Sequence, residues 1–278
     1  MTKIRFPALD ANAIVATRDT LHGYSRILGD WLKACRGRRK HWWHASLRPS
    51  LAGLTTGVVH ADVRFELELD LRDGLLVGRV ASGDELREPL VGQSSAALAA
   101  AVAEFLVAEG MPDGVAATVS ESEKITPGYS AEMAAVMAEA LAAVAAAFEA
   151  LRAGIVEETS PIQLWPHHFD LSMLWLPGTK IPGQDPGDEE HSDKQMNFGF
   201  GFGDDGIPEP YFYITAYPLP ETFPNLALPP GTQWKSEGFS GAVLAYRDLH
   251  AIADPEDYLL SLWNGLLAAG RDQMLPRC

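Results

Sequence analysis

VRFELELDL, residues 63–71, alternates apolar and charged side chains at every position. A strand with this period of two is apolar on one face and solvated on the other, which is typical of an antiparallel sheet with one exposed side. Asp73-Gly74 follows and supplies the residues that a tight hairpin turn needs at positive φ, before a second apolar run at 75–80. The stretch therefore predicts a half-exposed β-hairpin within a strand-rich region, residues 41–91.

Helical spacing of apolar side chains surrounds this region and returns later in the chain. It predicts helices at 18–36, 94–109, 130–153 and 255–269, the last with Pro255 in its first turn. Period-two or short apolar runs predict strands at 115–119, 162–165, 168–176, 196–203, 211–217 and 241–246. The predicted fold class is α+β, with antiparallel sheets and packed helices.

Both halves of the chain share one order of elements: a helix, several strands and a helix. We expect two pseudo-repeated helix-sheet-helix halves that form one co-folded body over residues 1–278. The polar stretch 120–128 is the expected internal boundary, which gives subdomains 1–119 and 129–278. A histidine-aromatic segment follows the first helix of each half, HWWH at 41–44 and WPHH at 165–168. We expect these two segments to lie close together.

Composition restricts the classes of partner. The formal net charge is -15, from 22 basic and 37 acidic residues, which argues against a nucleic-acid partner because such binding needs phosphates to be neutralised. The sequence shows no long apolar run and no secretion signal at its start, so we expect no membrane association and a cytoplasmic location. Cys35 and Cys278 are too few and too distant to indicate a disulfide framework or a cysteine metal site. The basic run RGRRK at 36–40 suits either a phosphate-bearing ligand or a solvated helix end.

His168, Asp170 and Ser172 alternate along the expected strand 168–176 and would share one face. A histidine and a carboxylate two residues apart on a strand can bind one metal, or the carboxylate can orient the imidazole as a general base. A histidine that only hydrogen-bonds its neighbours is the alternative. His41 and His44 could coordinate a metal jointly on a helix, but they would point to opposite faces on a strand.

Two further segments predict a pocket wall. MNFGFGFGD at 196–204 places three phenylalanines on one face and three glycines on the other, so a ligand or a crossing helix could approach the backbone closely. EPYFYITAYP at 209–218 places Tyr211, Tyr213, Thr215 and Tyr217 on one face. Phenols beside bare glycines would form a flat-walled small-molecule site, which the acidic loop 177–193 could cover.

Several strings together resemble a bacterial family catalogued as a domain of unknown function: TRDTLH at 17–22, HWWH at 41–44, GLTT at 53–56, SPIQLWPHHFD at 160–170, MNFGFGFGD and EPYFYITAYP. The resemblance spans nearly the whole chain and implies one co-folded unit. It implies no activity.

The leading hypothesis is a small-molecule pocket between the two halves that performs metal-dependent catalysis. His168, Asp170 and Glu209 are the candidate catalytic residues, and His44, His168, Asp170 and Glu209 the candidate ligands of a divalent metal. The candidate ligand-binding residues are His44, Trp43, His22, Trp165, Asn197, Tyr211 and Tyr213. The alternative is a non-catalytic protein that binds a ligand or partner and whose histidines are structural. Nucleophilic catalysis ranks third, because Ser160 and Ser172 lie near histidines but no G-x-S-x-G motif is present.

Overall fold

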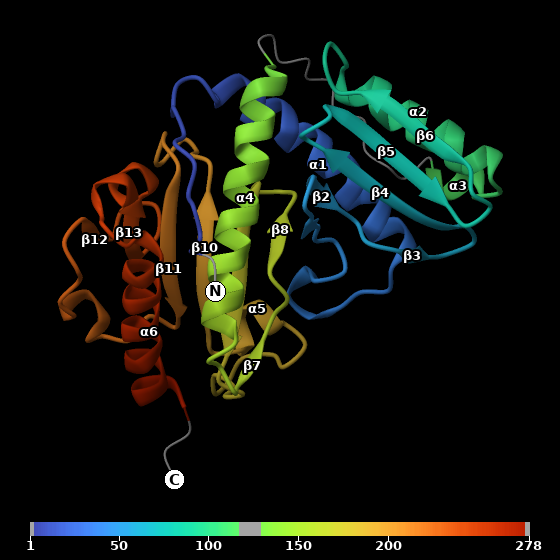
Figure 1. Ribbon diagram of the computed structural model, residues 1–278. Helices are drawn as coiled ribbons and strands as arrows, with labels where there is room; N and C mark the ends of the chain where they lie inside the picture. Colours follow the sequence, from blue (N-terminus) through green and yellow to red (C-terminus); the bar gives the residue numbers. More distant parts are fainter. Residues whose placement is uncertain (1–2, 117–128, 276–278) are drawn as a thin grey trace. The chain divides into compact units, whose positions relative to one another are not determined.

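The computed structural model describes residues 3–116 and 129–275 (Figure 1). The chain divides into two compact units. Unit 1 contains Met1–Ala11, Ala143–Ile162 and Asp170–Cys278, and unit 2 contains Asn12–Ala142 and Gln163–Phe169. Each unit has an antiparallel sheet and packed helices, which confirms the predicted α+β class. The predicted repeat of two equivalent halves is not confirmed, since the two sheets differ in strand order.

The sheet of unit 2 has strands β1 (Arg48–Pro49), β2 (Gly53–Thr55), β3 (Val59–His60), β4 (Arg64–Asp70), β5 (Leu75–Val80) and β6 (Glu85–Pro89). Its order is β1-β2-β4-β5-β6, with β3 also paired to β4. Gly74 has φ +69° at the turn between β4 and β5, so the predicted hairpin is confirmed.

One face of this sheet is covered by helices α1 (Val15–Cys35) and α2 (Ser95–Ala108) (Figure 1). Leu21, Leu28 and Leu32 of α1 are fully buried, and the ring of Trp31 meets Phe65 of β4 edge to face. Ser94 caps α2 by accepting a hydrogen bond from the Ala97 amide. These contacts form the core of unit 2.

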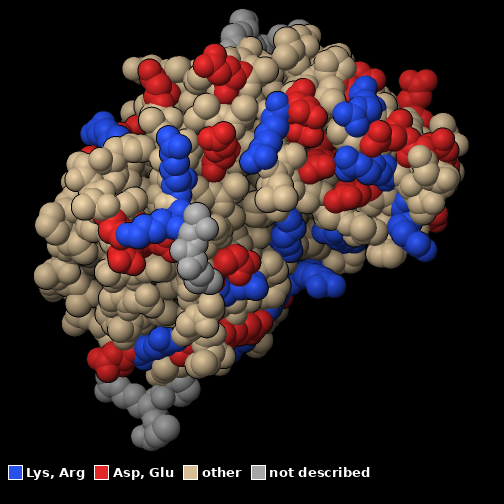
Figure 2. All heavy atoms as spheres, viewed as in Figure 1, with Lys and Arg blue, Asp and Glu red and all other residues tan. Residues whose placement is uncertain are grey.

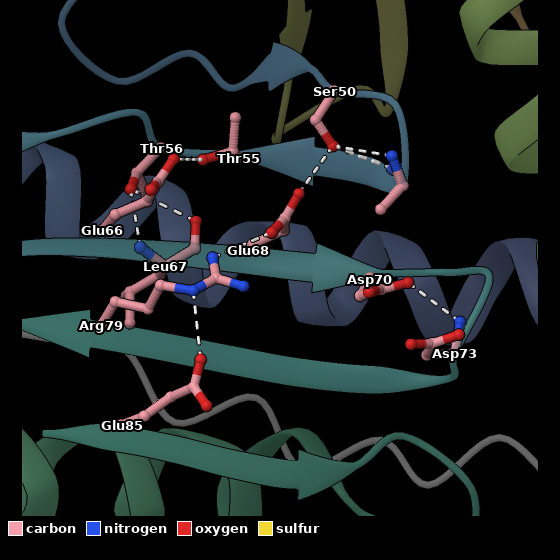
Figure 3. A network of polar contacts seen from close by, with 12 residues as sticks. Ser50, Thr55, Thr56, Glu66, Leu67, Glu68, Asp70, Asp73, Arg79 and Glu85 are labelled. Atoms are coloured by element: carbon pink, nitrogen blue, oxygen red, sulfur yellow. Dashed lines mark hydrogen bonds and ion pairs between the residues drawn. The ribbon is translucent and has the colours of Figure 1, made fainter.

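The opposite face of β4 and β5 carries charged side chains that bond to one another (Figure 3). Glu68 accepts hydrogen bonds from Ser50 at 2.8 Å and from Arg79 at 3.1 Å, and Arg79 also reaches Glu85 at 3.1 Å. Acidic and basic groups intermingle on the surface above these strands (Figure 2). This face is a solvated, self-compensated surface, as the alternation in VRFELELDL predicted.

The predicted strand at 115–119 is wrong where the structure describes it. Residues 115 and 116 belong to a short helix, α3 (Asp113–Ala116), whose amides at Val115 and Ala116 donate to the Pro112 carbonyl. Proline followed by aspartate is a common helix start, and this preference prevails over the apolar run. Residues 117–119 and the predicted connection at 120–128 lie outside the described residues.

Unit 1 is built on strands β7 (Glu158–Thr159), β9 (Asp170–Leu176), β10 (Gln195–Gly201), β11 (Tyr211–Tyr217), β12 (Thr232–Lys235) and β13 (Gly241–Ala245). The order is β12-β13-β11-β10-β9-β7. Helix α6 (Pro255–Met274) packs against this sheet, and its Trp263 stacks on Phe148 with ring centroids 4.8 Å apart. The remaining elements are β8 (Gln163–Trp165), α5 (Glu189–Ser192) and the 3-10 turns η1 (Lys40–Trp42), η2 (Phe223–Asn225) and η3 (Tyr246–Ala251).

Helix α4 (Ala131–Arg152) is divided between the two units. Among the described residues it is the one helix long and apolar enough to cross a membrane, with a mean hydropathy of 1.8 in its most apolar window. More than half of that window, 56%, is buried inside the protein, as in the core helix of a soluble globular domain.

Candidate functional site

The sheet of unit 1 separates an apolar face from a polar one, which we call the outer face. Phe198, Phe200, Phe212 and Ile214 are buried on the apolar face. The outer face carries the alternate residues of neighbouring strands: Asp170 and Ser172 of β9, Asn197, Gly199 and Gly201 of β10, Tyr211 and Tyr213 of β11, Val243 and Ala245 of β13, and Gln233 of β12. The predicted alternation is therefore confirmed over β10 and β11, whereas Phe202 and Gly203 of the phenylalanine-glycine segment follow the end of β10.

Tyrosine rings fill the space that the glycines leave. Gly199 is directly opposite Tyr213, and Gly201 is directly opposite Tyr211. A Cβ atom on Gly199 would overlap the Tyr213 ring, whereas one on Gly201 would make an ordinary contact of 3.4 Å with Tyr211. At Gly199 and Gly201 the group that covers the backbone is a tyrosine of the neighbouring strand, in place of the expected ligand or helix.

The phenol of Tyr213 donates a short hydrogen bond to Oδ2 of Asp170. Asn197 Nδ2 lies 3.4 Å from the same phenol oxygen, and its Oδ1 is buried with no hydrogen-bond partner among the described residues. Burial and then the negative charge of Asp170 raise the pKa of Tyr213 well above its usual range. Tyr213 therefore remains a neutral donor at physiological pH and fixes the Asp170 carboxylate.

Asp204 organises the loop that precedes β11. Its Oδ1 accepts hydrogen bonds from the amides of Gly206 at 2.7 Å and Ile207 at 2.8 Å, and its Oδ2 accepts one from the Tyr211 phenol at 2.5 Å. Burial, followed by this hydrogen bond and the charge of Asp204, raises the pKa of Tyr211. One carboxylate thus holds the 204–210 loop through two bonds and joins it to β11 through the third.

An open pocket of about 570 Å³ lies beside Tyr211, entirely within unit 1. The 204–210 loop forms one side, β12 and the residues after it form another, and β13 with the start of η3 closes the third. Its lining includes the charged residues Glu209, Lys235, Glu237, Arg247 and Asp248. The pocket therefore presents both signs of charge next to the phenol of Tyr211.

Glu209 forms an ion pair with Arg247 at 2.8 Å between Oε2 and Nη1. The Glu209 side chain is 23% exposed and that of Arg247 is 70% exposed, so the carboxylate is the better shielded partner. Glu209 was predicted as a metal ligand, but its carboxylate is paired with the guanidinium of Arg247. The arrangement suits recognition of charged ligand groups.

His168 does not share a strand face with Asp170 and Ser172, so that prediction is wrong. β8 ends at Trp165, and Pro166 begins a tight turn in which the amides of His168 and Phe169 both donate to the Trp165 carbonyl. Phe169 has φ +57°, and β9 begins only at Asp170. Proline restricts the backbone at this point and places the histidines in the turn.

The histidines of unit 2 are held by contacts with their neighbours. His22 Nε2 lies 3.2 Å from the His167 carbonyl oxygen, and its ring stacks on Phe169. Burial, followed by nearby positive charge that includes His168 and Lys33, lowers the pKa of His167 to about 4. His167 is therefore a neutral imidazole at physiological pH.

The HWWH segment forms the turn η1 and the residues after it rather than a strand or an α-helix. His41 and His44 are buried, and His44 Nδ1 accepts a hydrogen bond from the Arg39 amide at 3.2 Å. The Lys40 ammonium lies 5.1 Å above the Trp43 ring. The side chain of Trp165 meets His167 edge to face.

A divalent metal was predicted at His44, His168, Asp170 and Glu209. The two histidines belong to unit 2 and the two acids to unit 1. Within residues 3–116 and 129–275, no three His, Cys, Asp or Glu side chains are grouped so that they could hold a metal ion. The metal site stays a prediction that this arrangement of side chains does not support.

Several residues of the pocket were not predicted, among them Gln233, Lys235 and Arg247, and neither was Asp204, which holds the adjoining loop. β12 has only four residues and follows Pro229-Pro230, so it gives no clear strand pattern. Asp204-Asp205-Gly206 was a usable signal, since aspartate two residues before glycine is typical of a side-chain-bonded turn.

Comparison with known proteins gives a family but no activity. Searches among curated proteins and among solved structures find no match. Residues 6–274 match the family described as "Family of unknown function (DUF5996)", a span that includes both units almost completely. The chain therefore belongs to this family of unknown function.

Proposed function

We propose that unit 1 binds a small molecule that carries both positive and negative charge, in the pocket beside Tyr211. The observation that carries this proposal is the charged lining of the pocket, three acids and two bases around about 570 Å³. Pockets for small molecules commonly measure roughly 300–1,000 Å³ and contain a few placed polar groups. A zwitterion would satisfy both sets of charges, whereas an ion of one sign would face repulsion from the other set.

The Glu209–Arg247 pair gives the pocket its polarity. A ligand carboxylate would approach Arg247 and Lys235, and a ligand ammonium would approach Glu209 and Asp248. Glu209 is partly shielded from water, so its interaction with a cation is screened less than it would be on an open surface.

The pocket wall is preformed. Asp204 holds the turn at Gly206 and Ile207 in place before any ligand arrives, and Tyr211 anchors that carboxylate to β11. A preformed wall reduces the conformational entropy that binding would otherwise cost.

The proposed function is binding without metal-dependent catalysis, which was the alternative expected from the sequence. The proposed partners remain a small molecule rather than nucleic acid or a membrane, in keeping with the net charge of -15. A cytoplasmic location is also proposed, supported by the low cysteine content and by the free thiol of Cys35.

A thermal-shift panel on the full chain tests the proposal. Its probes are zwitterions (alanine, lysine, glutamate), anions (acetate, phosphate), a cation (putrescine) and a neutral sugar (glucose), followed by calorimetric titration of each stabilising probe. We expect a zwitterion to bind, and Glu209→Gln and Arg247→Gln each to weaken its binding about tenfold. The matched control, Arg87→Gln on β6 of unit 2, should bind as wild type does. The proposal fails if no zwitterion binds, or if the pocket variants and the control bind equally well.

A further inference from the structure

The segment between α1 and β1 of unit 2 combines basic side chains with unusual backbone geometry. His41 and Trp42 have φ +49° and +57°, a left-handed conformation that non-glycine residues rarely adopt. Two such residues in succession are strained, and strain of this kind is concentrated at functional sites. The result is that His41 is buried while Trp42 remains 44% exposed, with one ring face stacked on His44.

Positive charge gathers around this turn. Arg36 donates hydrogen bonds to the carbonyls of Thr56 and Val58, and Arg48 donates to Ser46 Oγ and Gln163 Oε1, so the acceptors of both are neutral. Within the described part of the chain, neither Arg36, Arg39 nor Arg48 forms an ion pair. Burial lowers the pKa of Arg48 to about 10, and the positive charges of Arg36 and Arg39 contribute to this shift.

Two acidic groups near this segment act on side chains other than these three arginines. Asp30 pairs with Lys33 at 2.5 Å, and Asp62 acts on the thiol of Cys35, whose pKa is raised mainly by burial. Among the described residues, Arg36, Arg39 and Arg48 thus have no carboxylate partner, although the chain has 37 acidic and 22 basic residues. An anion would relieve their repulsion.

A buried hydrogen-bond donor points to the same chemistry. Gln163 lies on β8 and is completely buried. An antiparallel bridge between Leu47 and Leu164 places β8 beside the start of β1. Its Oε1 accepts from Ser46 at 2.6 Å and from Arg48 at 2.9 Å, whereas its Nε2 has no partner among the described residues. An unsatisfied buried donor is costly, and an acceptor beside Arg48 would satisfy it.

We propose that the Arg36–Arg48 segment of unit 2, with Gln163, binds the oxyanion of a small phosphorylated molecule, and that Trp42 offers its exposed ring face to a planar group of that molecule. Arginine guanidinium groups match the geometry of phosphate oxygens, and an indole stacks on a planar base. This site is independent of the pocket in unit 1.

NMR titration of the full ¹⁵N-labelled chain tests this site, with inorganic phosphate, ribose 5-phosphate and AMP as probes at low ionic strength. We expect saturable shifts at the amides of residues 36–48 and weaker binding at high salt. Arg39→Gln should weaken binding about threefold to tenfold, because Arg39 is exposed and its replacement leaves the fold intact. Arg72→Gln, an exposed arginine at the β4–β5 turn of the same unit, is the matched control and should have no effect.

The probes separate the two parts of the proposal. Tighter binding of AMP than of ribose 5-phosphate, lost in Trp42→Ala, supports stacking, and equal affinity for both overturns it. The absence of saturable shifts with any phosphorylated probe overturns the oxyanion site. An equal effect of Arg39→Gln and Arg72→Gln would also overturn it, because binding would then follow overall charge alone.

Discussion

Replacing Gly199 with alanine should destabilise unit 1 strongly, whereas the same change at Gly201 should not. Both glycines lie on β10 opposite a tyrosine of β11, so the two substitutions are matched in chemistry and place. A Cβ on Gly199 overlaps the Tyr213 ring, and that on Gly201 stays 3.4 Å from Tyr211. Neither glycine has a positive φ, so backbone conformation does not contribute.

The loss of stability in Gly199→Ala can be calculated from the movement of the Tyr213 ring and the hydrogen bond that this movement breaks. The ring would have to move by roughly 1.5 Å to reach a normal carbon–carbon separation. That movement breaks its hydrogen bond to the Asp170 carboxylate, which costs about 1.5–3 kcal/mol, and overpacking adds roughly 1–3 kcal/mol. Gly201→Ala should instead be neutral or stabilise by about 0.4–1 kcal/mol, because alanine restricts the unfolded chain.

Urea denaturation of both variants and of wild type measures the difference. We expect the midpoint of Gly199→Ala to fall by about 1 M or more with little change in slope, and that of Gly201→Ala to stay within error. In a Tyr213→Ala background, Gly199→Ala should become nearly neutral, so the coupling energy should equal the full cost of the single variant, about 2.5–6 kcal/mol. Equal stability of the two single variants, or the absence of coupling, would refute the packing of Tyr213 on Gly199.

Three further predictions concern single polar contacts. Tyr211→Phe should lower the free energy of unfolding by about 1.5–3 kcal/mol and weaken binding in the pocket, because Asp204 loses its phenol donor. The control is Tyr217→Phe, on the exposed end of the same strand, and calorimetry measures both variants. The pKa of Glu157 is lowered to about 2, chiefly by its hydrogen bonds with Arg271. The free energy of unfolding should therefore fall as pH drops from about 4.5 toward 2, and Arg271→Gln should make that fall smaller. Burial lowers the pKa of His167 to about 4, so the contribution of its neutral imidazole to the free energy of unfolding is complete above pH 6.5 and is lost between pH 6.5 and 4. An ordinary pKa from NMR titration of this imidazole would contradict the assignment.

Local patterns were sufficient for much of the fold. The alternation in VRFELELDL and the aspartate-glycine pair predicted β4, its turn and β5, because a half-exposed hairpin is specified by neighbours in sequence. The alanine-rich stretch likewise predicted α4 to within about two residues.

The candidate site depended on pairings that local patterns do not specify. Gly199 and Tyr213 were each assigned to the correct face, but only the register between β10 and β11 shows that the ring covers the glycine. The pocket depends on β12, a four-residue strand after two prolines, and on Arg247 in η3. His168 was placed on a strand because the preference of Pro166 for the second position of a turn was not weighed against the alternation.

Binding of a zwitterion in the pocket beside Tyr211 can be located residue by residue by NMR. Amide chemical shifts of the full ¹⁵N-labelled chain would be recorded during titration with alanine, lysine and glutamate. We expect saturable shifts that are largest at Gly206–Glu209, Gln233–Glu237 and Arg247, the residues that surround the pocket. Saturable shifts that are largest outside these residues, or no saturable shift with any of the three probes, would contradict the proposal.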